Sequence, residues 1–204
     1  MAETFIQLPP DSTGKRIRTR TKSILGETVH EQAVYQTALP TFWAVADAVT
    51  LAQNKHHISI FNGTADKMVI VRKLFQINLQ LTTVTGVALR FNAFRSTAQS
   101  AGTAITPVAA DLDDILPANI TVATNATVTN GSLMFPYVTQ NDEMTAANTA
   151  VANYLTQYNN LLLDGPEIKE LRLRPSQGLT IQQITSSTVG SFGWLMAFTV
   201  DDDL

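Results

Sequence analysis

Three histidines are the first residues to test for chemistry, because imidazole can bind metal ions or transfer protons. His30 is followed by Glu31, but no second histidine stands at the spacing of a zinc-binding H-E-x-x-H helix. His56 and His57 are adjacent, so on a strand their side chains point to opposite faces and cannot share one metal ion without a bulge. We interpret all three histidines as structural residues.

A group of aspartates is the second candidate. Asp111, Asp113 and Asp114 lie close together in a stretch rich in alanine and threonine. Paired carboxylates can transfer protons or hold calcium, but the group lacks the D-x-[DN]-x-[DN]-G pattern of a calcium loop. Solvated loop carboxylates are the simpler interpretation. The sequence also has no G-x-S-x-G, phosphate-binding or dinucleotide-binding motif. We therefore predict no catalytic residue, cofactor or metal ion, and no enzyme activity.

A basic run near the N-terminus is the third candidate. It consists of Lys15, Arg16, Arg18, Arg20 and Lys22. The alternation puts the arginines on one face of an extended strand. Such a run can bind nucleic acid through phosphates, but no aromatic residue interleaves it to stack on bases, and the sequence pI is about 5.5. We predict an arm that contacts a neighbouring subunit or a capsid shell, without specific nucleic-acid binding.

Composition limits the class of protein. The chain of 204 residues has no cysteine, which excludes disulfides, and charged residues make up only 15%. Residues 1–100 carry eleven Lys/Arg and six Asp/Glu, whereas residues 101–204 carry three and eleven. This asymmetry fits either two solvated faces or complementary contacts, between copies or with a larger assembly. No apolar run reaches the roughly 20 residues of a membrane span, and no secretory signal opens the chain.

The elements that would position these residues are strands. Residues of alternating type predict three consecutive strands within 57–95, the last two joined as a hairpin by a loop of about five residues. Further strands are predicted at 133–138, where Pro136 marks an edge or a bulge, and at 171–173, 179–181 and 192–200. Residues 38–55 fit a helical face at Phe42, Val45, Val49 and Ala52 and fit a strand less well, so mixed structure is predicted there.

Two longer segments have weaker patterns. Residues 96–130 are predicted to form a long excursion with one short strand near 120–122 and a turn at Asn130 and Gly131. Residues 142–163 have apolar residues at helical spacing, which predicts one helix in a long loop.

The final strand is apolar on both faces, so Phe192, Trp194 and Met196 are expected in the core or in a subunit interface. It is expected to face 57–95 across the fold.

Together these elements predict an all-β protein. The best fit is a two-sheet antiparallel β-sandwich of jelly-roll type at 38–204, preceded by an extended N-terminal arm at 1–37.

Several stretches occur in an order that resembles a known family. They are NKHHISIFNG, MVIVRKLFQINLQ, VTGVALRFNAFR, GTAITPVAADL, LPANITVATNATVT and LRLRPSQGLTIQQITSSTVGSFGWLMAFT, and PPDSTGKRIRT near the N-terminus fits as well. This is similar to a family of structural proteins encoded in tailed-bacteriophage genomes, over about residues 9–200.

The resemblance implies a virion component, made in the bacterial cytoplasm and located on the capsid surface. It implies a capsid decoration or cement protein with a jelly-roll body. Its partners would be the major capsid protein and copies of itself, as a homotrimer. The alternative left open by the sequence is a tail- or fibre-associated adhesion module that binds a host surface glycan.

Overall fold

Strands are the only regular elements in the part of the chain that the computed structural model describes, which is 3–7, 16–24, 27–32, 39–78, 87–140, 161–162 and 169–202. The chain divides into two units, Met1–Ala38 and Leu39–Leu204. In the first unit β1 (Glu3–Gln7), β2 (Arg16–Ile24) and β3 (Glu27–Gln32) form an antiparallel sheet in the order β1-β2-β3. The register places Arg20 opposite Glu3 of β1 and Glu31 of β3.

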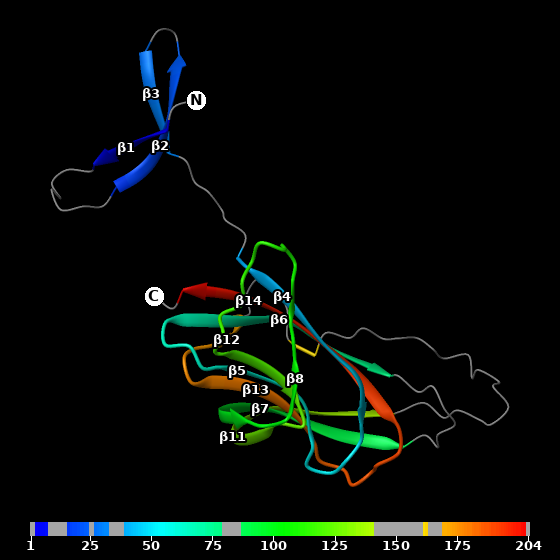
Figure 1. Ribbon diagram of the computed structural model, residues 1–204. Helices are drawn as coiled ribbons and strands as arrows, with labels where there is room; N and C mark the ends of the chain where they lie inside the picture. The colour runs from blue at the N-terminus through cyan, green and yellow to red at the C-terminus, as the bar shows by residue number, and fades with distance from the viewer. Residues whose placement is uncertain are drawn as a thin grey trace, which may run out of the picture. The chain divides into compact units, whose positions relative to one another are not determined.

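The second unit contains two antiparallel sheets that pack face to face (Figure 1). The six-stranded sheet has the order β11-β7-β13-β5-β10-β8 and the five-stranded sheet the order β12-β6-β14-β4-β9. The strands are β4 (Thr41–Thr50), β5 (His56–Asn62), β6 (Lys67–Asn78), β7 (Ala88–Ser100), β8 (Thr103–Ile105), β9 (Val108–Ala109), β10 (Ile120–Thr124), β11 (Thr127–Gln140), β12 (Leu171–Leu173), β13 (Gln177–Gln183) and β14 (Ser191–Asp202). The predicted all-β, two-sheet antiparallel sandwich is confirmed, and its jelly-roll topology stays a prediction.

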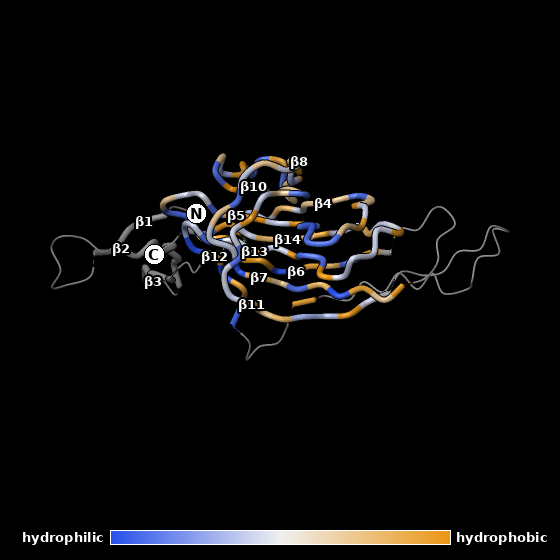
Figure 2. The backbone as a smooth tube through the Cα atoms, turned by 90° about the horizontal axis from the view of Figure 1, so that it is seen from below, coloured by the Kyte–Doolittle hydropathy of each residue, from blue (hydrophilic) through white to orange (hydrophobic). Residues whose placement is uncertain are grey.

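The core lies between the two sheets, and its side chains come from alternate positions of the strands. Figure 2 shows hydrophobic residues, in orange, along strands of both sheets. Aromatic rings connect the layers: Phe91 of the six-stranded sheet lies 5.6 Å from Trp194 and 6.0 Å from Phe192 of the five-stranded sheet, centroid to centroid. Burying each such side chain contributes about 1.5–3 kcal/mol to the free energy of folding. The buried aromatic residues of β14 therefore stabilise the packing of the two sheets.

The predicted hairpin between the second and third strands of 57–95 is wrong. β6 pairs with β12 and β14 in one sheet, whereas β7 pairs with β11 and β13 in the other. The chain therefore passes from one sheet to the other between β6 and β7, and residues 79–86 lie outside the described residues. Alternation of residue types identifies a strand but not its partner. For the same reason β14 faces only part of 57–95: β5 and β7 lie across the sandwich, but β6 is its hydrogen-bonded neighbour.

The ambiguous segment 38–55 contains a strand whose alternation is interrupted. Phe42, Ala44 and Ala46 are buried, and burial then resumes at Val49 rather than one residue earlier. Ala48 has a φ of 47°, and the pairing with β14 shifts at the same place. A β-bulge of this kind adds one residue to a strand, which is why neither a period of two nor a helical period fitted the whole segment.

The excursion at 96–130 is more regular than predicted. The short strand near 120–122 is confirmed as β10, but β7 continues to Ser100, and β8 and β9 also fall within the segment. The predicted turn at Asn130 and Gly131 is wrong, because both residues lie inside β11 at a register shift. β11 is an edge strand, as Pro136 indicated. The predicted helix at 142–163 lies outside the described residues except for Leu161 and Leu162, which are not helical.

No helix of the described residues is long and apolar enough to cross a membrane.

Candidate interaction surface

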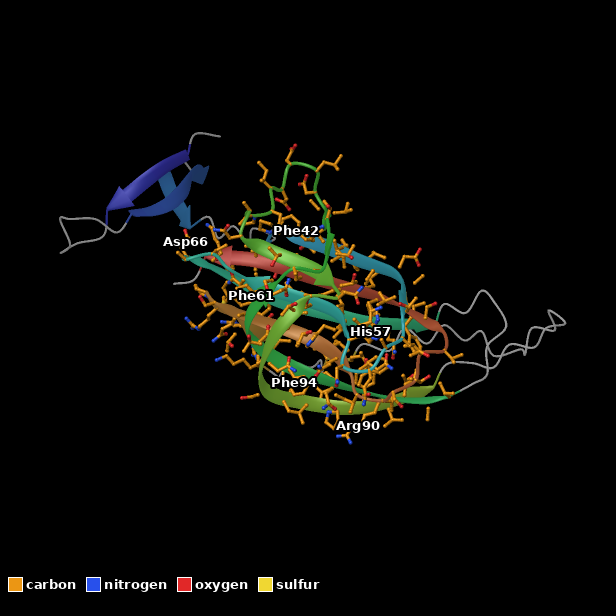
Figure 3. The ribbon with its side chains drawn as sticks, turned by 60° about the horizontal axis from the view of Figure 1, so that its bottom comes forward. Phe42, His57, Phe61, Asp66, Arg90 and Phe94 are labelled. Atoms are coloured by element: carbon orange, nitrogen blue, oxygen red, sulfur yellow. The ribbon has the colours of Figure 1, made fainter. Side chains whose placement is uncertain are left out.

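The two adjacent histidines are both buried at the start of β5, and each has its own partner. His56 Nδ1 lies 2.8 Å from Thr180 Oγ1, and His57 Nε2 lies 3.0 Å from Gln183 Oε1. The pairing of β5 with β13 shifts register between Ile181 and Gln182, which is the bulge that turns His57 into the core (Figure 3). The ring of His57 packs against Phe91 and Trp194 at 5.1 and 5.8 Å.

Gln183 determines which nitrogen of His57 carries the proton. Its Nε2 donates to the carbonyls of Thr185 and Ser187 at 2.8 and 2.6 Å, so its Oε1 is the acceptor that faces His57. His57 therefore donates through Nε2 and is unprotonated at Nδ1. Gln183 Oε1 also accepts from the N–H of Ala52 at 3.0 Å. The side chain thus ties the loop after β4 to the loop after β13.

Burial, with a smaller contribution from the positive charges of Lys55 and His56, lowers the pKa of His57 to about 4, although the hydrogen bond to Gln183 opposes this shift. The imidazole is neutral near pH 7 and has a packing role. Sequence reasoning missed this pair, although Gln183 has the same parity on β13 as the buried Leu179 and Ile181. A polar residue that continues an inward-facing apolar row is the signal that identifies it.

The aspartates lie in the loop between β9 and β10, where they shape the backbone. The N–H of Asp113 donates to Asp111 Oδ1 at 3.1 Å, and the N–H of Asp114 donates to the Asp111 carbonyl at 3.0 Å. Asp111 thus closes a turn of the kind that Asx residues favour. Within the described ranges no three His, Cys, Asp or Glu side chains are grouped to hold a metal ion.

Large apolar side chains are exposed on β4, β9 and the loop that follows. Trp43 of β4 and Val108 of β9 are paired across the two strands and are 41% and 64% exposed. Val45, two residues along β4, is 54% exposed, and Leu112 and Ile115 in the loop are 92% and 87% exposed. We call these five residues the apolar surface. Large apolar side chains left this exposed are candidates for contact with a partner.

The loop is held at both ends, so its apolar residues are presented from a fixed base. The N–H of Ala110 donates to the Thr41 carbonyl at 2.8 Å, which attaches the loop to the five-stranded sheet. At the other end the N–H of Gly63 donates to the Asn119 carbonyl at 2.9 Å, next to β10 of the six-stranded sheet. Figure 1 shows the loop, in green, at one end of the body. A pre-ordered loop loses little entropy when it binds.

The opposite edge of the five-stranded sheet is basic. β12 is flanked by Lys169 and contains Arg172, both exposed. Glu170 forms ion pairs with Arg72 and with Arg172, the latter at 3.4 Å between Oε2 and Nη2. Arg95 donates through Nη1 to the Arg172 carbonyl at 2.7 Å. In this part of the described chain one carboxylate, that of Glu170, thus lies among the four cations of Lys169, Arg172, Arg72 and Arg95. We call this group of residues the basic edge.

The other sequence-predicted residues fall in two places. Phe192, Trp194 and Met196 lie in the core between the sheets, and all three are buried. Arg16, Arg18, Arg20 and Lys22 occupy alternate positions along β2, and Lys15 lies outside the described residues. The apolar surface was not predicted, because alternation shows which strand face is apolar but not whether another layer covers it.

No protein-family model, curated protein or solved structure matches this chain.

Proposed function

We propose that the chain is a structural virion protein of a tailed bacteriophage, which binds the capsid surface as an oligomer and stabilises the head. The observation that carries the proposal is the apolar surface, whose most exposed members are Leu112 and Ile115. Burying either side chain against a partner would contribute about 1.5–3 kcal/mol. A shell that repeats the contact many times adds these contributions over the whole particle.

The family resemblance supports the same conclusion. The segments that carry it contain all or most of the strands β5 to β10 and β12 to β14, which are nine of the eleven strands of the two sheets. The proposal includes a jelly-roll body, a homotrimer, the major capsid protein as partner, and the capsid surface as location. A rigid sandwich with loops anchored to both sheets suits a protein that must clamp neighbouring shell subunits without changing shape.

The basic run of β2 provides a test of shell binding. We expect the triple variant Arg16→Gln, Arg18→Gln, Arg20→Gln to bind purified shells that lack the protein about tenfold more weakly at low salt, because it loses charge attraction to an acidic surface. The measurement is co-sedimentation with shells over a range of protein and salt concentrations. Arg90→Gln is the matched control, since Arg90 is an exposed arginine on β7 (Figure 3).

The control is expected to bind like the unmodified chain. Equal binding by the triple variant at every salt concentration would show that the basic run contacts no shell or neighbouring subunit.

A further inference from the structure

The body of the protein has two edges of opposite charge. Residues 101–140 contain three aspartates and no lysine or arginine, and these aspartates lie in the loop that bears Leu112 and Ile115. Among the described residues, the basic edge around β12 combines Lys169, Arg172 and Arg72 with one glutamate, Glu170. In the strand order of the five-stranded sheet, β9 and β12 are the two outermost strands. The acidic loop and the basic edge therefore lie at opposite margins of one sheet.

The basic edge also offers apolar and backbone groups. Leu171 of β12 is only partly buried against the core. β12 pairs with β6 on one side, and its other side meets no strand among the described residues. An edge strand of this kind can accept a segment from another chain.

We propose that the acidic loop of one copy docks on the basic edge of the next copy. Leu112 and Ile115 pack against Leu171, while Asp113 and Asp114 lie opposite Lys169 and Arg172. This deepens the proposed function and rests on it, because it supplies the copy-to-copy contact of the oligomer that binds the shell.

Charge selects this arrangement over a symmetric contact. If two copies met through their apolar surfaces, the aspartates of one loop would approach those of the other, and like charges oppose such contacts. A contact between two different patches of the same chain is heterologous. It closes into a ring when the rotation between subunits allows closure, and a trimer is the smallest such ring beyond a pair.

The test uses charge reversal in the full chain. Asp113→Lys with Asp114→Lys is expected to weaken self-association at least tenfold, measured by light scattering and native mass spectrometry at low salt. Lys169→Glu with Arg172→Glu is expected to do the same. The chain that carries all four substitutions should recover the oligomer, because attraction across the contact is restored with its signs exchanged.

Two features keep the result interpretable. Asp111 is left in place because it closes the loop turn, and thermal unfolding of each variant verifies that the body still folds. Arg90→Glu reverses a charge on the six-stranded sheet and is expected to leave the mass unchanged.

Any one of three results would overturn the proposal. The unmodified chain could be monomeric at all concentrations, the two double variants could keep the oligomer mass of the unmodified chain, or the variant with all four substitutions could stay dissociated. The second and third results leave the proposed function standing, because the copies could associate through another surface. A chain that is monomeric at all concentrations would also count against the oligomer of the proposed function. Conversely, rings that dissociate as expected but never bind shells would support the contact and count against the shell-binding function.

Discussion

Replacing Trp194 with alanine is expected to lower the free energy of unfolding of the Leu39–Leu204 unit by about 3–5 kcal/mol. Trp194 is fully buried in the middle of β14, between Ala46 of β4 and Gln76 of β6 in the register. Its ring touches Phe91 and His57 from the other sheet. Alanine would remove this apolar contact and leave a cavity that a close-packed sandwich cannot collapse to fill.

The other tryptophan of the chain is the matched control. Trp43 lies on the neighbouring strand β4, points to the outer face and is 41% exposed. Trp43→Ala is expected to cost about 1 kcal/mol or less, because little buried contact is lost. Urea unfolding followed by circular dichroism measures both variants. Equal losses of stability, or an unchanged midpoint for Trp194→Ala, would contradict the position of Trp194 in the core.

A third variant separates packing from hydrogen bonding. Trp194 Nε1 has no hydrogen-bond partner among the described residues. Trp194→Phe therefore removes no hydrogen bond within the described part of the chain, and it is expected to cost clearly less than Trp194→Ala.

The second large effect is a loss of stability in acid. His57 has a pKa of about 4 in the folded chain, against 6.5 for an unperturbed histidine, because burial disfavours the charged ring. Between these values the unfolded chain binds the proton and the folded chain does not. The contribution of His57 is therefore fully present above pH 6.5 and is lost as the pH falls towards 4. The linkage amounts to roughly 3 kcal/mol.

The variant His57→Leu isolates this contribution from that of titrating carboxylates. In this variant Gln183 Oε1 still accepts a hydrogen bond from the N–H of Ala52, so the substitution leaves that oxygen paired. We expect the variant to lose less stability than the unmodified chain between pH 7 and 4, in urea titrations at each pH. Identical pH profiles for the two chains would show that His57 does not titrate with a lowered pKa in the folded state.

The strands could be predicted from the sequence, but several of their partners could not. The alternation around Val69 and Val71 identified β6, because a half-buried strand repeats every two residues. Which sheet receives the next strand depends on packing between distant segments, so β6 and β7 were wrongly paired. The bulge at Ala48 is a second reason why the prediction was incomplete. One inserted residue inverts the alternation, so the strand no longer has a period of two along its whole length.

Functional residues were harder to predict than strands. His57 and Gln183 are far apart in the sequence, and only the bulge in β5 brings the imidazole to the amide. The exposure of Leu112 and Ile115 depends on a loop that turns at Asp111 and is held by both sheets. The sequence shows the signs of the charges in the acidic loop and at the basic edge. Their location at opposite edges could not be predicted, because it depends on the strand order of the five-stranded sheet.

A cryo-electron microscopy map of the phage virion tests the central proposal most directly. The proposal predicts density for the β-sandwich in many copies over the capsid surface, grouped in threes, with the loop at Leu112 and Ile115 in contact with a neighbouring chain and residues 15–22 against a subunit or the shell. Density confined to the tail or to fibres at a single vertex would contradict it. That result would instead favour an adhesion module that binds a host glycan.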